Sequence, residues 1–396
     1  MIHASELRLD VGAAAVLPAV AALLLLVVTG GTRHRLRRAG RTLLAVSSTV
    51  AVLLACGATA NLLGGFFPTV GSLIGSSPDP GEGSVADVGP DGAGLQAALP
   101  LVAARSAQGL GSTLHLTLHG PASGIDRDAD VYLPPGYTEH PGLRFPVVEW
   151  LPGFPGEPRE VAALFRVPDV LDAAVAAHRI PPVVMVVPDI NGEPRFGHDQ
   201  ECVDAQHGAR DDTYLTTDLV GWTARHLRVR TDRGAWALAG WSSGGYCAMN
   251  LALRHPRTYG LAVSQSGYDR TPDDVVTGEL FAGRPDLAAA NDVVALLGER
   301  PAPLAMLVTA GTDEPDERAA AERIRAAAGP PVSVDTRVYP GGGHNQNAVR
   351  AQLPDLVDWL GAHLLPPLAP AAAPAAGVTI DDGPGVPQRE LPVPDP

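Results

Sequence analysis

The 396-residue sequence contains no lysine, so all 29 of its basic residues are arginine. Aspartate and glutamate together number 43, which gives a formal net charge of −14. Proteins that bind nucleic acid concentrate positive charge to displace counterions, whereas the one arginine cluster here, over residues 33–41, lies between two apolar stretches. We therefore expect no nucleic-acid partner.

Cysteine and aromatic residues are also scarce. The three cysteines, Cys56, Cys202 and Cys247, are too few for a disulfide-stapled miniprotein, and their spacing matches no zinc site. No other pattern predicts a metal ion or a cofactor. Apolar residues nevertheless make up 45% of the chain, which is too many for an intrinsically disordered protein.

Two long apolar stretches occupy the N-terminal region. Residues 11–28 carry no charge, and residues 43–63 are interrupted only by small polar residues and Asn61. About 20 apolar residues span the core of a bilayer, and short basic loops such as 33–41 stay cytoplasmic. The pattern predicts a transmembrane hairpin over residues 1–70, with helices at about 11–31 and 43–63, a cytoplasmic loop at 32–42, and the rest of the chain outside the cytoplasm.

Two other interpretations of this region exist. A cleaved signal peptide would have one apolar stretch, whereas this sequence has two with a basic stretch between them. The run Leu53–Cys56 is typical of a lipoprotein processing site, which would place a lipid on Cys56. The residues after Cys56 remain apolar, although the tethered end of a lipoprotein is normally polar, so we favour the hairpin.

The rest of the chain divides into a linker, one large domain and a tail. Glycine, serine, proline and aspartate dominate residues 71–105, which we expect to form a linker. Residues 106–366 are enough for one α/β domain. The Pro/Ala-rich residues 367–396 are expected to be disordered.

Short apolar runs alternate with helix-like segments within residues 106–366. This pattern favours a mostly parallel sheet with helices on both faces, preceded by an antiparallel start. The expected strands are Leu114–Leu118, Asp130–Leu133, Val147–Leu151, Val183–Val187, Ala235–Leu238, Leu261–Ser264, Ala305–Thr309 and Val332–Val338. The expected helices are Val170–Ala177, Tyr214–His226, Tyr246–Leu253, Asp292–Leu297, Glu317–Ala328 and Leu353–Leu364.

A Gly-x-Ser-x-Gly pattern follows one of the expected strands. The strand Ala235–Leu238 leads into Gly240–Gly244, and a helix-compatible run comes next. Strand, turn and helix in this order are typical of a nucleophile elbow, where glycines leave room for a strained turn that exposes the serine. Ser242 is therefore the candidate nucleophile.

A serine nucleophile needs a histidine base, which follows it in the chain of such folds. His344 lies on a glycine-rich loop directly after the last expected strand, from which it could reach the elbow. His178, His226 and His255 lie in helical contexts and are more typical of surface or packing positions. We therefore expect His344 to be the base.

A carboxylate should orient the histidine, and it should lie between the serine and the histidine in the sequence. The strand Ala305–Thr309 runs into three candidates, Asp313, Glu314 and Asp316. Glu314 is our first choice, with Asp313 the alternative acid and Asp316 the third.

The oxyanion of an acyl-transfer intermediate needs two N–H donors. One is the residue after the nucleophile, here Ser243, and the other comes from the loop after the third strand. In that loop, Leu151–Gly156, the prolines cannot donate, which leaves Gly153 and Phe154. We choose Phe154.

Two further features lie near these residues in the sequence. Cys202 and Cys247 belong to the part expected outside the cytoplasm, where a disulfide persists, although two buried free thiols are an alternative. Such a disulfide would fix the loop around 199–204 over the site. Residues 189–192 are expected to form a turn or the rim of a pocket rather than a metal site.

These motifs resemble the putative-esterase branch of the α/β-hydrolases, which holds esterase D-type enzymes, feruloyl esterases and secreted mycobacterial mycolyltransferases. The resemblance implies an α/β-hydrolase fold in which Ser242, His344 and Glu314 are catalytic and Phe154 and Ser243 bind the oxyanion. The hairpin followed by Phe66–Gly71 is similar to a membrane-anchored group of these esterases in high-GC Gram-positive bacteria. The segments that carry the resemblance are Asp130–Tyr137, Pro146–Gly156, Gly240–Gly245, Gly311–Glu314 and Gly342–His344.

The sequence thus predicts a membrane-anchored, extracytoplasmic serine esterase or acyltransferase that forms an acyl-enzyme on Ser242. Its substrate would be a small-molecule, lipid or glycan ester, and no segment points to a long acyl chain. A serine peptidase of the same fold is one alternative, although no propeller repeat precedes the domain. A catalytically inactive binding module is the other.

Overall fold

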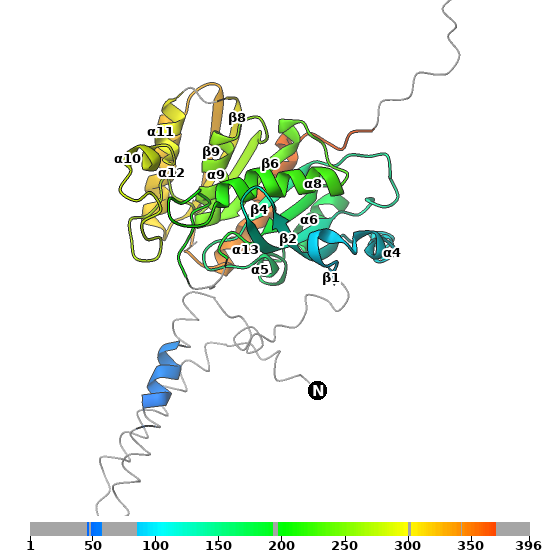
Figure 1. The fold of residues 1–396 in the computed structure, drawn as a ribbon, viewed down its shortest axis with the longest axis horizontal. Coiled ribbons are helices and arrows are strands. Elements are labelled where there is room, and N and C mark those ends of the chain that lie inside the picture. The colour runs from blue at the N-terminus through cyan, green and yellow to red at the C-terminus, as the bar shows by residue number, and fades with distance from the viewer. Residues whose placement is uncertain are drawn as a thin grey trace, which may run out of the picture.

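A mixed β-sheet forms the centre of the computed structural model, which describes residues 46, 49–57, 85–192, 197–299, 302–341 and 343–369 (Figure 1). Within these residues the sheet has nine strands in the order β1-β2-β3-β5-β4-β6-β7-β8-β9. Strands β2 and β3 pair antiparallel, as do β3 and β5, while β5, β4 and β6 to β9 run parallel. The expected antiparallel start of a mostly parallel sheet is confirmed. The strands are β1 (Val85–Asp87), β2 (Ser112–Gly120), β3 (Ile125–Leu133), β4 (Val147–Leu151), β5 (Val184–Pro188), β6 (Trp236–Trp241), β7 (Leu261–Gln265), β8 (Leu304–Gly311) and β9 (Val332–Tyr339).

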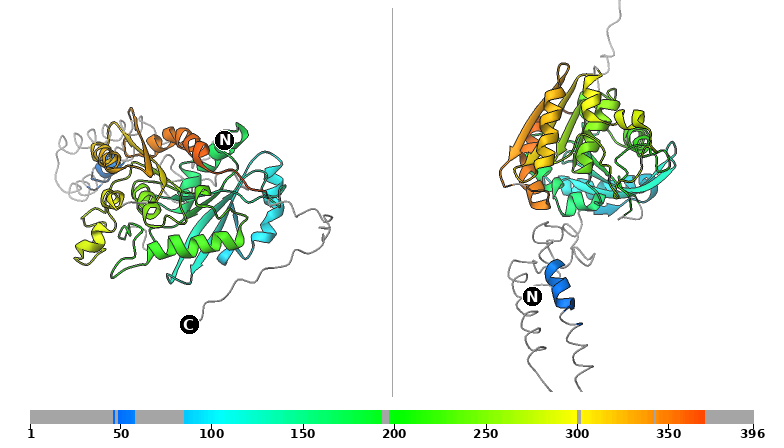
Figure 2. Two further views of the ribbon diagram at one scale, coloured as in Figure 1. Left: turned by 90° about the horizontal axis from the view of Figure 1, so that it is seen from above. Right: turned by 90° about the vertical axis from the view of Figure 1, so that its left-hand side faces the viewer.

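Helices cover both faces of the sheet (Figure 2). One apolar core packs the sheet against α4, α8, α9, α11 and α12, and a second packs it against α5, α6 and α13. The central strands β4, β5 and β7 are buried along their whole length, as expected for strands covered on both faces. The helices are α4 (Leu95–Ser106), α5 (Pro158–Ala163), α6 (Val167–Ala176), α7 (Asp211–Thr213), α8 (Val220–His226), α9 (Ser243–Arg254), α10 (Pro285–Ala289), α11 (Val293–Gly298), α12 (Pro315–Ala327) and α13 (Gln346–His363), with a π-helical segment at Tyr214–Leu219 and short 3₁₀ turns at Pro90–Gly92 and Arg233–Ala235.

The boundary expected at residue 106 is wrong, because residues 85–105 belong to the folded domain. Strand β1 extends the sheet by pairing in parallel with β2, and α4 packs on the same core. Val102 is 1% exposed and Leu95 is also buried. Burial of these apolar side chains outweighs the glycine and proline content on which the linker prediction rested.

Two other element boundaries also differ from the expectation. Helix α13 begins at Gln346 rather than at Leu353, because Asn345 caps it by accepting hydrogen bonds from the backbone N–H groups of Asn347 and Ala348. At the C-terminal end, the domain extends beyond residue 366, since Leu368 pairs with Arg144.

Most of the predicted hairpin, and the predicted tail beyond residue 369, lie outside the described residues. Residues 49–57, inside the second predicted span, are helical. Among the described residues, the helices are too short or too polar to cross a bilayer.

Candidate active site

Ser242 lies on the tight turn between β6 and α9. Its backbone has φ 58° and ψ −124°, a strained conformation for a residue with a side chain. A Cβ on Gly240 would lie 2.3 Å from the Gly244 carbonyl oxygen, and one on Gly244 would lie 2.2 Å from the Leu151 carbonyl oxygen. Both glycines of the motif are therefore required for the turn to pack against β4.

The structure brings Ser242, His344 and Glu314 together, although they are separated widely in the sequence. Ser242 Oγ lies 2.8 Å from His344 Nε2, and His344 Nδ1 lies 2.9 Å from Glu314 Oε1. The serine follows β6, the acid follows β8 and the histidine follows β9, so all three lie at the carboxyl edge of the parallel strands. This edge is where open α/β sheets place their ligands.

Glu314 is 3% exposed, and both of its carboxylate oxygens accept hydrogen bonds. Oε2 accepts hydrogen bonds from the Ser266 hydroxyl at 2.8 Å and from the Gly311 N–H at 2.5 Å. Burial opposes ionisation of the carboxyl, but the hydrogen bonds from His344, Gly311 and Ser266 outweigh it and lower the pKa of Glu314. The group is thus an ionised carboxylate held in one orientation.

The alternative acids do not take this position. Asp313 and Asp316 are exposed, and the Asp313 carboxylate accepts a hydrogen bond from the neighbouring Thr312 hydroxyl. Glu317, which the sequence reasoning did not single out, lies 3.7 Å from His344 Nδ1 through its Oε1 atom. Its position at the first turn of α12 beside Glu314 is the signal that could have found it.

Two more residues missed at the sequence level support the histidine and the acid. The Trp241 ring stacks on the His344 imidazole with centroids 5.0 Å apart, and Trp241 is the variable residue before the serine in the motif. Ser266, which holds Glu314, follows β7 directly. Its position at the carboxyl end of a central strand would have been sufficient to suggest it.

The loop that carries Phe154 packs tightly against the elbow. A Cβ on Gly153 would lie 3.1 Å from Ser242 Cβ, so this position must be small. The Phe154 N–H donates to the Ser243 hydroxyl oxygen at 2.9 Å. The Ser243 N–H opens helix α9, and the first N–H groups of a helix have no partner within it.

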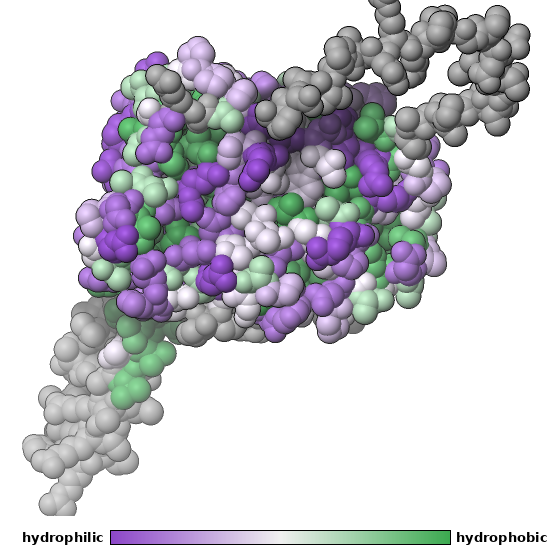
Figure 3. Space-filling model, turned by 45° about the horizontal axis from the view of Figure 1, so that its top comes forward, coloured by the Kyte–Doolittle hydropathy of each residue, from purple (hydrophilic) through white to green (hydrophobic). Residues whose placement is uncertain are grey.

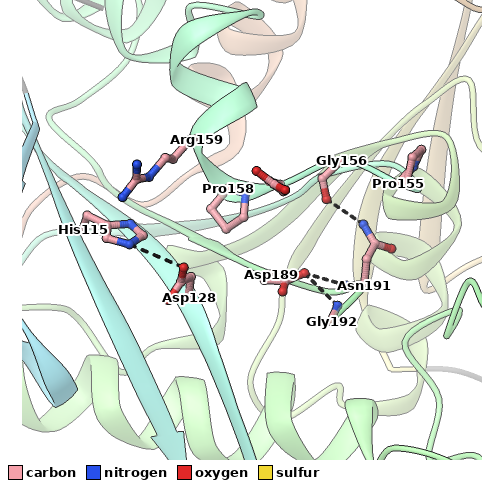
Figure 4. A pocket seen from close by; sticks show the side chains of 10 residues that line it. His115, Asp128, Pro155, Gly156, Pro158, Arg159, Asp189, Asn191 and Gly192 are labelled. Atoms are coloured by element: carbon pink, nitrogen blue, oxygen red, sulfur yellow. Dashed lines mark hydrogen bonds and ion pairs between the residues drawn. The ribbon is translucent and has the colours of Figure 1, made fainter. Parts of the chain in front are cut away.

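The side-chain amide of Asn191 fixes the other side of this loop. Its Nδ2 donates to the carbonyl oxygens of Gly153, at 3.1 Å, and Gly156, at 2.7 Å (Figure 4). Residues 189–192 form a turn, in which Asp189 accepts from the N–H groups of Asn191 and Gly192. The same turn lines a cavity of about 290 Å³, together with His115 and Arg159. The segment thus forms both the turn and part of the rim of a pocket, as expected.

Cys202 and Cys247 form a disulfide, with Cα atoms 5.7 Å apart. The bond ties the segment around Asp199 and Glu201 to helix α9, five residues beyond the candidate nucleophile. Both carboxyls are buried, and burial raises the pKa of Asp199 to about 6 and that of Glu201 well above its usual value. Among the described residues, no cluster of three or more His, Cys, Asp or Glu side chains is arranged to hold a metal ion.

Known proteins resemble this chain over the region that holds these residues. The family described as "Putative esterase" matches residues 121–360. An uncharacterized protein of Corynebacterium glutamicum is 30% identical over 273 residues, which cover 66% of this chain and 61% of that protein. The MPT51/MPB51 antigen of Mycobacterium tuberculosis is 35% identical over 79 residues, or 20% of this chain and 26% of the antigen. The alignments thus span less than two thirds of either relative.

Solved structures show the same fold. A ferulic acid esterase superposes with a TM-score of 0.56 at 21% identity, covering 64% of this chain and 98% of the esterase. The family match extends over more than half of the chain and includes the loop of Phe154, the elbow of Ser242 and the positions of Glu314 and His344. The chain therefore belongs to the Putative esterase family, and it has the α/β-hydrolase fold.

Proposed function

We propose that this protein is a serine esterase or acyltransferase that works through an acyl-enzyme on Ser242. The observation that carries the proposal is the continuous chain of hydrogen bonds from Ser242 Oγ through His344 to the ionised Glu314. In acylation, the Ser242 proton passes to His344 Nε2 while Oγ forms a bond to the ester carbonyl carbon. The departing alcohol then takes that proton as its bond to the carbonyl carbon breaks.

The second half of the reaction repeats these steps with a different nucleophile. Water, or the hydroxyl of an acceptor, loses its proton to His344 Nε2 and attacks the acyl-enzyme, and Ser242 regains a proton as it leaves. Glu314 stabilises the imidazolium that forms in both halves, because its carboxylate accepts from Nδ1. The N–H groups of Ser243 and Phe154 are the proposed donors to the oxyanion.

We also propose that the catalytic domain is held at the outer face of the membrane by two spans at about 11–31 and 43–63. Within the described part of the second span, Leu53 and Leu54 are 65% and 58% exposed, which gives an apolar surface suited to lipid. Figure 3 shows the described residues of this span as a mostly hydrophobic group. The disulfide between Cys202 and Cys247 supports an oxidising compartment. Reporter fusions in the 32–42 loop and after residue 369 test this topology, which fails if both score on the same side.

The experiment that tests the chemistry is intact-mass analysis of the full-length protein after a fluorophosphonate probe. The wild type, Ser242→Ala, His344→Ala and Ser264→Ala are compared, the last removing a buried hydroxyl on β7 as a matched control. We expect one adduct on the wild type and on Ser264→Ala, none on Ser242→Ala, and slow labelling of His344→Ala. A folded wild type that forms no adduct would overturn the proposal and favour an inactive binding module.

A further inference from the structure

The Ser243 hydroxyl is hydrogen-bonded to the Phe154 N–H, which is one of the two proposed oxyanion donors. Its oxygen accepts from the Phe154 N–H at 2.9 Å, and the residue is only 2% exposed. The backbone leaves this pair little freedom, because a Cβ on Gly244 would lie 2.4 Å from the Pro152 carbonyl oxygen and one on Gly153 would touch Ser242. The start of α9 and the loop of Phe154 are therefore packed directly against each other.

The buried carboxyl of Asp199 lies on the other side of this hydroxyl. Asp199 is 5% exposed, and its Oδ1 accepts from the Glu201 N–H at 3.1 Å. Burial raises the pKa of this carboxyl, and the nearby Ser243 hydroxyl lowers it less strongly. A hydroxyl has a single proton. When the Ser243 hydroxyl donates that proton to Asp199, its oxygen can only accept a hydrogen bond from the Phe154 N–H. Asp199 is itself held by its N–H, which donates to the Val276 carbonyl, and by the nearby disulfide from Cys202 to α9.

We propose that Ser243 is a capping residue of the resting enzyme: its hydroxyl, oriented by Asp199, covers the Phe154 N–H until a substrate oxygen displaces it. The inference rests on the proposed acyl transfer at Ser242. It makes Ser243 a residue with two opposed roles, since its backbone N–H stabilises the oxyanion while its side chain competes for the other donor. The hydroxyl thus slows acylation rather than supporting it.

Removal of the cap should therefore speed the reaction. A hydrogen bond between neutral groups contributes about 0.5–1.5 kcal/mol net, so Ser243→Ala should label about 2- to 12-fold faster with a fluorophosphonate probe. The gain should appear in kinact and leave KI unchanged, because charge develops on the oxygen only as the bond to Ser242 forms. Ser243→Thr keeps a hydroxyl and should restore the wild-type rate.

The test uses the full-length protein, with Ser264→Ala as the control for loss of a buried hydroxyl, because no hydrogen-bond partner of the Ser264 hydroxyl is found among the described residues. An unchanged or lower kinact in a folded Ser243→Ala, or a Ser243→Thr that is as fast as Ser243→Ala, would overturn the capping role. If Ser243→Ala does not fold, Ser243→Cys keeps the size of the side chain but replaces the hydroxyl by a weak acceptor, and a kinact that does not rise would count against the cap. Wild-type protein that does not label at Ser242 would instead refute the proposed function, so the two failures are distinguishable.

Discussion

Replacement of Glu314 by glutamine tests the acid of the site, because the structure fixes how the new amide must lie. The Glu314 Oε2 position receives two donors, the Ser266 hydroxyl and the Gly311 N–H. An amide NH₂ placed there would face both donors, and each unsatisfied buried group costs about 1–3 kcal/mol. The glutamine oxygen therefore takes this position, and its NH₂ faces His344 Nδ1.

This orientation sets the wrong tautomer of the histidine. With an NH₂ donor in front of it, Nδ1 must be an acceptor, so the single proton of the neutral imidazole moves to Nε2. Nε2 can then no longer take the proton of Ser242, from which it lies 2.8 Å away. We expect kcat to fall by about 10³- to 10⁴-fold, equivalent to roughly 4–5.5 kcal/mol, with little change in KM.

The assay is steady-state hydrolysis of a p-nitrophenyl ester, with a urea unfolding curve to confirm that each variant is folded. Asp313→Asn neutralises the exposed neighbouring carboxylate and should keep its activity within about 2-fold of the wild type. Glu317 lies 3.7 Å from the same histidine nitrogen, so the double variant Glu314→Gln/Glu317→Gln shows whether it replaces the acid. A Glu314→Gln enzyme that keeps more than about a tenth of the wild-type kcat, with the double variant equally active, would refute the reasoning.

Two further predictions concern stability. Reduction of the disulfide, or a Cys202→Ser/Cys247→Ser variant, should lower the free energy of unfolding by about 4 kcal/mol, because the bond closes a loop of 45 residues in the unfolded chain; equal urea midpoints with and without reductant would contradict this. Burial raises the pKa of Glu149 to about 8, while the unfolded chain releases this proton near 4.5. Between these two pKa values the unfolded state binds fewer protons than the folded state, so the free energy of unfolding should fall as the pH rises. The slope should be steeper in the wild type than in Glu149→Gln by roughly 1.4 kcal/mol per pH unit. Urea titrations between pH 5 and 7.5 measure this difference, and parallel curves would rule it out.

The parts of the site that could be predicted from the sequence are those at the ends of parallel strands. Ser242, Glu314 and His344 each follow a predicted strand of the parallel part of the sheet, and parallel strands bring their carboxyl ends to one edge. The linker prediction failed for a related reason, since it weighed local composition alone. Leu95 and Val102 are two helical turns apart, and their burial depends on a core that the segment itself does not contain.

The residues that could not be predicted act through contacts between loops. Asn191 reaches the carbonyls of Gly153 and Gly156, and Asp199 reaches Ser243, across sequence separations of about 40 residues. Such contacts depend on the conformation of each loop, including the positive φ of 53° at Cys202. The sequence offers no period or spacing that encodes them.

The hydrogen bond between the Phe154 N–H and the Ser243 hydroxyl affects both the stability of the fold and the rate of acylation. An oxyanion donor must point into a site that is empty before substrate binds, and a partly buried N–H that loses its hydrogen bond destabilises the fold by about 0.5–1.5 kcal/mol. The Ser243 hydroxyl satisfies this donor in the resting state at 2.9 Å. The same Ser243→Ala substitution that speeds acylation should therefore lower the free energy of unfolding by about 0.5–1.5 kcal/mol. Ser264→Ala should not lower it, because no partner of the Ser264 hydroxyl is found among the described residues. If Ser243→Ala speeds acylation without lowering the free energy of unfolding, water must replace the hydroxyl as the partner of the Phe154 N–H. The Ser243 hydroxyl would then slow acylation without stabilising the fold.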